Sequence, residues 1–157
     1  MQSLKTIVLK TDPTLSYTVL RVTLGLVLMI HGVEKVGAGY QPFIEFFTGY
    51  LNMPIFLGWM TIFIEIVGSA LLILGLGTRI QALSMFGLFV GMIAFVHWDY
   101  GFLMNWSAQL EAGQEGFEYH ILVLSMCSGL VVGGGGKFSV DAILFENSNP
   151  QHVTNKG

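Results

Sequence analysis

The segment from Met53 to Leu76 constrains this chain most. It is long and apolar enough to cross a bilayer, and it carries one charged residue, Glu65, near its centre. An ionisable group at membrane depth costs roughly 2.5–3.5 kcal/mol on insertion scales. Such a group is expected to face a bundle interior or a cavity and to be paired or protonated. We therefore expect a protein that works in a membrane.

The composition of the chain favours the same class. Hydrophobic residues make up 53% and charged residues 11% of the 157 residues, and the mean hydropathy is +0.67. The net charge of −3 supplies no basic surface, which argues against nucleic-acid binding. Cys127 is the single cysteine and lies in an apolar run, so we expect no intrachain disulfide and a buried, inert thiol.

Four apolar segments are expected to be membrane-spanning helices, at about residues 17–36, 55–76, 80–98 and 117–132. The first is too long for the core of a signal peptide, so we expect it to remain as a helix. The predicted fold class is all-α, an integral membrane four-helix bundle. Residues 1–145 form its single transmembrane domain, and residues 146–157 are expected to be a disordered polar tail.

Basic residues predict the orientation of the bundle, because short loops rich in Lys and Arg stay cytoplasmic. Lys5, Lys10, Arg79, Lys137 and Lys156 would then lie on one side, whereas residues 98–117 contain neither Lys nor Arg. Both termini are predicted to be cytoplasmic in a multi-pass protein of the cell (plasma or inner) membrane, with Lys35 the exception at the outer end. The tryptophans and most tyrosines then gather in an outer interfacial belt.

Residues 41–51, between the first two spans, place aromatic side chains at helical spacing. One interpretation is a short interfacial helix between helices 1 and 2. The other is a hydrophobic lid packed on the bundle. The sequence favours both equally.

Small residues mark faces where membrane helices approach closely. Gly87 and Gly91 form a GxxxG pattern, which predicts a face for a homo-oligomer or for a partner redox subunit. Glu65 shares a face with Thr61, Gly68 and Ser69. On the fourth span Glu118 roughly shares a face with serines and a glycine, namely Ser125, Ser128 and Gly129. Both glutamates are therefore expected to point inward.

Titratable residues gather at the outer depth of the predicted bundle. They are His31, Glu34, Lys35, His97, Asp99, Glu118 and His120. A stripe on the first span, Arg21, Gly25, Leu28, Gly32 and Lys35, is placed to meet Glu65.

Two interpretations of these groups stay open. One is a polar pocket opening outward, in which His31 and His97 exchange protons and Glu65 is held neutral. The other is a structural network with Arg21–Glu65 and Lys35–Glu118 ion pairs. His120, about 200° around the helix from Glu118, is expected to face the interface.

Other motifs are excluded by their details. The run from Gly133 to Lys137 lacks the Ser or Thr and the upstream Gly of a phosphate loop. Ser139 is instead predicted to cap a short helix through Phe145. No two histidines share a helix at ligand spacing, so no metal site is predicted.

Taken in order, several motifs resemble the DoxX family over about residues 18–142. They are Leu20-Arg21, Leu24-Gly25, His31-Gly32-Val33-Glu34-Lys35, Glu65-Ile66-Val67-Gly68, the run from Leu71 to Arg79, and the run from Gly135 to Asp141. The resemblance implies a four-helix membrane protein linked to membrane oxidoreductase complexes and, through DoxD relatives, to thiosulfate:quinone oxidoreduction. The functional residues that it implies are Arg21, His31, Lys35, Glu65, Arg79 and His97.

The leading hypothesis is a quinone-associated oxidoreductase subunit with no intrinsic cofactor, in which a quinone headgroup binds in the outer half of the bundle. His31, Glu65 and His97 are the predicted catalytic residues. The predicted ligand-binding residues are Arg21, Lys35, Glu118 and Arg79. The alternative is a non-catalytic scaffold subunit of a membrane complex. A solute carrier is disfavoured, because no inverted repeat is evident.

Overall fold

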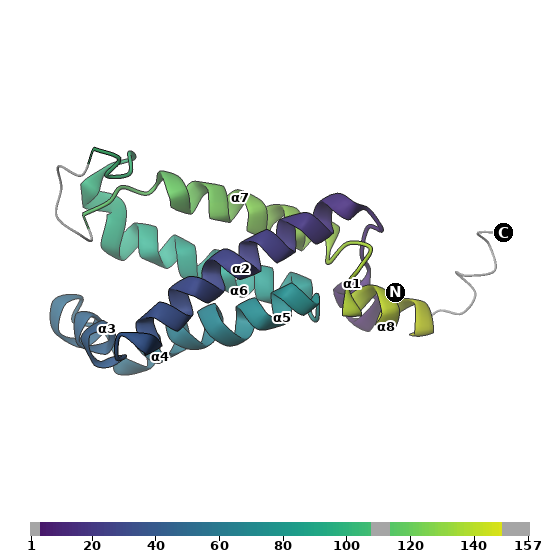
Figure 1. Ribbon diagram of the computed structural model, residues 1–157, viewed down its shortest axis with the longest axis horizontal. Coiled ribbons are helices and arrows are strands. Elements are labelled where there is room, and N and C mark those ends of the chain that lie inside the picture. The colour runs from purple at the N-terminus through teal and green to yellow at the C-terminus, as the bar shows by residue number, and fades with distance from the viewer. Residues whose placement is uncertain (1–3, 108–113, 149–157) are drawn as a thin grey trace.

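The computed structural model describes residues 4–107 and 114–148, and all regular secondary structure in these ranges is helical (Figure 1). The prediction of an all-α fold is therefore confirmed. The α-helices are α1 (Leu4–Leu9), α2 (Leu15–Gly37), α3 (Gln41–Glu45), α4 (Ile55–Phe63), α5 (Ser69–Leu74), α6 (Thr78–Met92), α7 (Glu118–Gly133) and α8 (Val140–Ser148).

Two of the long helices are interrupted by π turns. The π turn η2 (Ile64–Gly68) joins α4 to α5, and η3 (Ile93–His97) with the 3₁₀ turn η4 (Trp98–Tyr100) extends α6. A further π turn, η1 (Phe46–Tyr50), follows α3. Single π turns inside helices are rare and frequently occur at functional sites. Glu65 lies in η2 and His97 ends η3, so both residues belong to such turns.

Within residues 4–107 and 114–148, three helices are long and apolar enough to cross a membrane: Leu15–Gly37, Ile55–Leu74 and Thr78–Tyr100. The fourth apolar helix, α7, has 16 residues and is about 24 Å long at 1.5 Å per residue. The hydrocarbon core of a bilayer is about 30 Å thick, so α7 is short for a span. The helix bounds lie within two residues of the four spans expected from the sequence.

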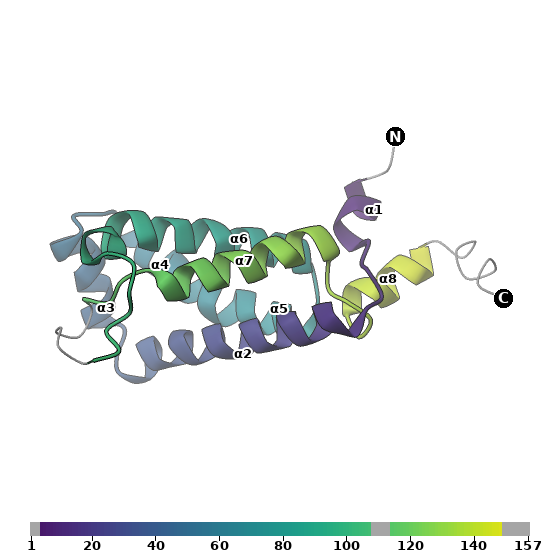
Figure 2. The same cartoon turned by 90° about the horizontal axis from the view of Figure 1, so that it is seen from above.

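The four long helices run side by side along the long axis of the molecule (Figures 1 and 2). α7 packs along α6 and also contacts α2, and α2 packs against α5 and η2. Helices α1 and α8 contact each other at one end of the bundle. α3 and the loop after η4 lie at the opposite end.

The core is built from the inward faces of these helices. It contains Leu24 and Leu28 of α2, Leu72 of α5, and Met85 and Phe89 of α6, among others. On α7 the buried positions are His120, Val123, Cys127, Leu130 and Gly133, which follow helical spacing. The buried thiol expected at Cys127 is confirmed.

The expectation of an inward serine face on the fourth span is wrong. Ser125 and Ser128 are exposed, and each hydroxyl donates a hydrogen bond to a carbonyl of its own helix, at Ile121 and Leu124. The apolar residues of α7 take the inward face instead, because they pack against the core of α2 and α6.

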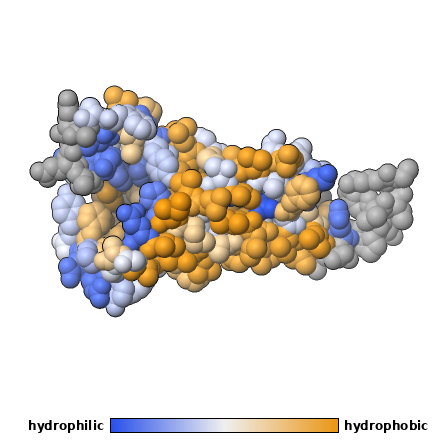
Figure 3. All heavy atoms as spheres, in the orientation of Figure 1, coloured by the Kyte–Doolittle hydropathy of each residue, from blue (hydrophilic) through white to orange (hydrophobic). Residues whose placement is uncertain are grey.

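The outer surface of the bundle is largely hydrophobic along its middle, with hydrophilic residues gathered towards the end that carries α3 (Figure 3). Large apolar side chains there are exposed, including Phe63 (62%) and Val132 (75%). Such a surface suits lipid rather than water. Gly87 and Gly91 belong to the part of this surface that no helix covers closely, since a Cβ at either position would meet nothing within 4 Å.

Backbone hydrogen bonds join the first and the last residues of the connection between η4 and α7. Residues 101–103 pair with residues 116–118 through backbone hydrogen bonds of 2.8–3.1 Å.

At the opposite end of the bundle, the backbone N–H of Ala142 donates to Ser139 Oγ over 3.1 Å, so the predicted cap of α8 is confirmed. α8 runs three residues beyond Phe145, and residues 149–157 of the expected tail lie outside the described residues.

Candidate functional site

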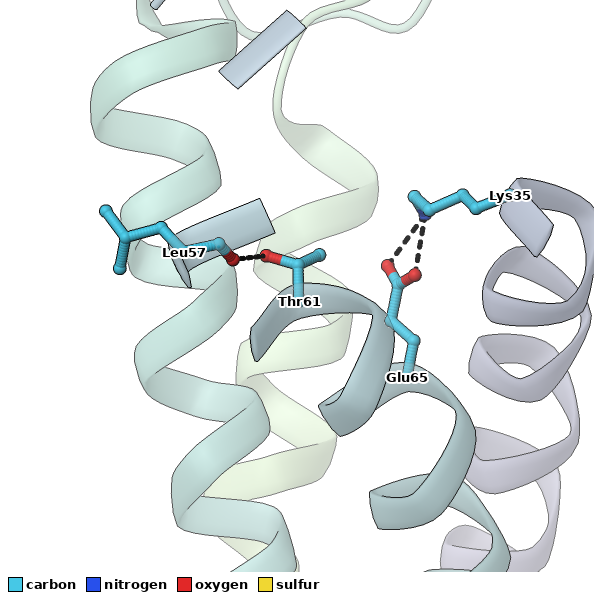
Figure 4. Close-up of polar contacts among 4 residues, drawn as sticks. All are labelled: Lys35, Leu57, Thr61 and Glu65. Atoms are coloured by element: carbon cyan, nitrogen blue, oxygen red, sulfur yellow. Dashed lines mark hydrogen bonds and ion pairs between the residues drawn. The ribbon is translucent and has the colours of Figure 1, made fainter. Parts of the chain in front are cut away.

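Lys35 and Glu65 form an ion pair inside the bundle (Figure 4). The Nζ atom of Lys35 lies 2.7 Å from Oε2 and 2.9 Å from Oε1 of Glu65. The Glu65 side chain is 2% exposed and that of Lys35 is 19% exposed. Charged groups from two crossings thus meet in the interior, but the predicted partners are wrong: Glu65 pairs with Lys35 and not with Arg21.

A close approach between α2 and η2 brings these two side chains together. Gly32 stands one turn before Lys35, and a Cβ at Gly32 would lie 2.7 Å from Ile66 Cγ1 and 3.0 Å from Glu65 Cβ. Glycine therefore allows the two backbones to pack this closely. Thr61 shares the buried face of Glu65, and its hydroxyl donates to the Leu57 carbonyl of its own helix (Figure 4).

A row of rings continues from this ion pair towards the loop. The ring centroids are 6.3 Å apart for His31 and Tyr119, 5.8 Å for Tyr119 and His120, and 4.2 Å for His120 and His97. His31 is exposed at the surface of α2. Both His31 and Tyr119 lie within electrostatic range of Glu65. We call the group His31, Lys35, Glu65, His97, Tyr119 and His120 the histidine end.

His120 is 4% exposed and lies between Phe89 of α6 and His97 of η3. The expectation that it faces the interface is therefore wrong. Its inward position follows from the apolar face of α7, which His120 continues by one turn beyond Val123.

The hydrogen bond of His97 fixes which of its nitrogens is free. His97 Nδ1 lies 2.7 Å from the backbone oxygen of Glu115. A carbonyl oxygen only accepts hydrogen bonds, so Nδ1 carries the proton and donates. The other nitrogen, Nε2, keeps its lone pair in the neutral ring and is able to take a proton.

Two buried polar atoms at the histidine end have no hydrogen-bond partner among the described residues: the Tyr119 hydroxyl and His120 Nδ1. Leaving a buried polar group unpaired costs about 1–3 kcal/mol, so such groups call for an explanation in a folded protein. Both atoms are able to bond an oxygen atom of a ligand.

Glu118 binds the loop and not Lys35. Its Oε1 accepts a hydrogen bond of 2.5 Å from Nε1 of Trp106. The predicted Lys35–Glu118 pair is wrong, because Lys35 is engaged with Glu65. Glu118 instead ties the chain after η4 to the first turn of α7.

Arg21 is buried at the other end of the bundle and bonds only to backbone carbonyls. It donates to Gly135 over 2.7 Å and to Leu72 over 3.1 Å, and also to Ile73 and Phe138. Leu72 and Ile73 stand in the last turn of α5, where the final carbonyls of a helix need partners from outside its regular bonding. The Leu72 carbonyl also accepts from the N–H of Gly75 over 3.0 Å. Arg21 therefore joins the end of α5 to the loop before α8.

Asp141 and Arg79 bond to backbone at the same end. The carboxylate of Asp141 accepts from the N–H groups of Gly77 and Thr78, both at 2.8 Å, where α6 begins. Arg79 donates to the carbonyl of Lys10, with Nη2 at 2.9 Å, and to that of Val131. We call Arg21, Arg79, Asp141 and the loop Gly133–Gly136 the arginine end. The residues predicted from the sequence thus fall into two groups, since Arg21 and Arg79 do not reach the histidine end.

The structure also has an open groove of about 560 Å³ on the outer face of α4 and η2. Its lining is apolar and includes Trp59, Phe63 and Ile66. The groove contains none of the titratable residues predicted to form a pocket. Within the described residues, no three His, Cys, Asp or Glu side chains lie close enough to hold a metal ion.

The family model named DoxX matches residues 16–98, just over half of the chain. The chain belongs to the DoxX family. It is also similar to the Bacillus subtilis (strain 168) protein named "Putative oxidoreductase CatD", with 27% identity over 135 residues, 86% of this chain and 91% of that protein. No solved structure matches the chain. Together with the apolar helices, the family identifies a membrane protein.

Sequence reasoning missed Tyr119 and Asp141 as contributors to the two ends, and it placed His120 at the correct depth but on the wrong face of its helix. Tyr119 and His120 lie beyond the matched region, at the start of α7. The signal available in the sequence was their polar character at the head of an apolar helix. Asp141 follows the glycine loop by five residues and lies in the first turn of α8, and nothing in that local pattern indicates that its carboxylate bonds to the start of α6.

Proposed function

We propose that this DoxX protein is a quinone-associated subunit of a membrane oxidoreductase system and that a quinone headgroup binds at the histidine end. One observation carries the proposal: the buried hydroxyl of Tyr119 has no hydrogen-bond partner among the described residues and lies in electrostatic range of Glu65, which is paired with Lys35. The name of the Bacillus subtilis relative, "Putative oxidoreductase CatD", supports an oxidoreductase setting.

The residues present fit the chemistry of a quinone. A quinone headgroup is a flat apolar ring with two carbonyl oxygens, so it needs apolar walls and hydrogen-bond donors. Phe89 and Tyr119 supply aromatic surface, and the Tyr119 hydroxyl and the ring of His31 supply donors. Glu65 is the acid–base group of this proposal, and Lys35 holds it in place. Electrons would come from a partner redox subunit.

The proposed orientation places both termini in the cytoplasm and the histidine end on the outer side of the plasma membrane. It rests on the basic residues, since Lys10, Arg79 and Lys137 lie at or beside the arginine end. Residues 41–50, which form α3 and η1, then lie at the outer interface as an amphipathic segment.

Quinone binding is tested with the purified protein in detergent. We expect mass spectrometry of an organic extract to find quinone, and decylubiquinone to raise the melting temperature. Tyr119→Phe removes the hydroxyl alone and should weaken decylubiquinone binding at least tenfold. Tyr17→Phe, which alters a tyrosine packed on Gly133 far from Glu65, should leave binding unchanged. An extract without quinone, together with no thermal shift, would overturn the proposal.

A second candidate function is a scaffold subunit, and the open face at Gly87 and Gly91 favours it. Small residues that no helix covers allow a second helix to approach. On this reading Gly87→Leu disrupts assembly with a second copy or a partner subunit while the isolated protein keeps its melting temperature. His31→Ala and His97→Ala would leave assembly and activity intact. Loss of activity in either histidine variant with assembly preserved would exclude a purely structural role.

A further inference from the structure

We propose that His97 and His120 form a proton-exchange pair that connects the buried histidine end with solvent at the Glu115 side of the molecule. The pair deepens the proposed function, because reduction of a quinone consumes protons and its oxidation releases them. It also gives a role to His120, which the proposed quinone site does not use. The test below uses no quinone, so the two proposals fail independently.

Geometry places the two imidazoles in series. Their ring centroids are 4.2 Å apart, although they come from different helices, η3 and α7. His120 is the inner member, at 4% exposure. His97 is half-buried and bonds to the backbone of Glu115 in the loop, so it is the member nearer to solvent.

The hydrogen bonds give the pair a direction. Nδ1 of His97 is committed to the Glu115 carbonyl, which leaves Nε2 as its proton-accepting nitrogen. Nδ1 of His120 has no partner among the described residues and is available to the buried cluster. A proton held by His120 passes to Nε2 of His97, and His120 returns to the neutral form. His97 then releases one proton to solvent and returns to the neutral form, with Nδ1 bonded to the Glu115 carbonyl as before. One proton moves, and no electron is transferred.

The groups around the pair are consistent with such a path. On α6 the neighbour is Phe89, which forms an apolar wall and offers no competing base. The charged and titratable groups at this end belong to the remaining elements that surround the pair. They are His31 and Lys35 of α2, Glu65 of η2, Asp99 of η4, Glu115 of the loop, and Glu118 and Tyr119 of α7. Glu65 and Lys35 neutralise each other, and Glu118 is held by Trp106.

The experiment follows the ring protons of the full-length protein in lipid nanodiscs. The chain has four histidines, so selective ¹⁵N-histidine labelling gives few signals, which single substitutions assign. We would measure solvent exchange of the His120 ring proton at a fixed pH, in the unmodified protein and in the variants. We expect His120 to exchange in the unmodified protein and His97→Phe to slow that exchange at least tenfold.

Two matched variants make the result specific. His120→Phe should leave the exchange of His97 fast, because His97 is the solvent-side member. His31→Phe, on the far side of Tyr119, should leave the exchange of His120 unchanged. Equal exchange of His120 with and without His97 would overturn the proposal, as would a His120 ring proton that does not exchange in the unmodified protein. If His97→Phe does not fold, His97→Gln is used to test whether the exchange of the His120 ring proton depends on His97.

Discussion

The two ends of the bundle bury charged groups in different ways. At the arginine end Arg21 and Asp141 bond to main-chain carbonyl and N–H groups. At the histidine end Lys35 and Glu65 bond to each other, and Tyr119 and His120 each keep one buried polar atom that has no partner within the described part of the chain. Main-chain groups do not titrate and hold fixed positions. The arginine end is therefore suited to holding helices together, whereas the histidine end keeps groups able to exchange a proton or bind a ligand.

The difference also lies in what each end connects. Arg21 links α2 to the end of α5 and to the loop before α8, and Asp141 links α8 to the start of α6. Among the described residues, the buried side-chain oxygen at this end without a hydrogen-bond partner is the Thr78 hydroxyl. At the histidine end the contacts join side chains of four crossings with few main-chain bonds. Substitutions at the two ends should therefore have different effects.

The largest expected effect is that of Arg21→Met. Removing the guanidinium takes the side-chain donor away from the carbonyls of Ile73, Gly135 and Phe138, so we expect a loss of more than about 3 kcal/mol in unfolding free energy. Denaturant unfolding in detergent, followed by circular dichroism, measures it. Lys137→Met is the control, because Lys137 is exposed and should cost less than about 1 kcal/mol. Similar losses in the two variants would contradict a structural role for the arginine end.

Lys35→Met should destabilise the protein by about 2 kcal/mol, because the Glu65 carboxylate is left buried without its cation. Adding Glu65→Gln to this variant removes the uncompensated charge and should recover most of the loss. The same unfolding assay measures both. Additive losses in the double variant would show that the two side chains do not interact.

Gly75→Ala and Gly87→Ala compare a crowded glycine with an open one. Gly75 has φ of +71°, and a Cβ there would lie 2.5 Å from Ser139 Cβ and 2.9 Å from Arg21 Cζ. We expect a loss of about 1–3 kcal/mol. Gly87 is helical with open space, so alanine there should be neutral or raise stability by up to about 1 kcal/mol. Thermal unfolding of the two variants under matched conditions decides this comparison.

The smallest effect is expected for Tyr119→Phe in protein stripped of bound small molecules. The variant removes a buried hydroxyl that has no partner among the described residues, so stability should rise by up to about 1 kcal/mol. Unfolding midpoints measured after delipidation report it, with Tyr17→Phe alongside. A loss of stability would mean that the hydroxyl is satisfied within the protein.

Much of the fold follows from the sequence, because long apolar runs and small residues specify helices and their contact faces directly. The stripe Arg21, Gly25, Leu28 and Gly32 is the buried face of α2. The partner of Glu65 could not be predicted. Arg21 and Lys35 lie on one face but about 21 Å apart along the helix, at 1.5 Å per residue. Which of them meets Glu65 depends on how far α2 is shifted along its neighbour, and no local pattern encodes that shift.

The rotation of α7 about its own axis could not be predicted from the sequence either. A helix that is apolar almost all round shows little periodicity, so Glu118 and the serines suggested an inward face that the structure assigns to His120, Val123 and Cys127. The rotation is set by the tertiary contacts of α7 with α2 and α6. The candidate site was consequently predicted in its α2, η2 and η3 residues, whereas on α7 Tyr119 was missed and His120 was expected to face outward.

The shortness of α7 has a consequence for the surrounding lipid. Its 16 residues cover about 24 Å, several ångströms less than a typical hydrocarbon core, while its neighbours are longer. Hydrophobic mismatch on this one side should draw the bilayer thinner along α7 than along α2. Polar headgroups and water then reach deeper at the α7 flank, beside the head of the helix that carries Tyr119 and His120. The membrane itself would become part of the route to the histidine end.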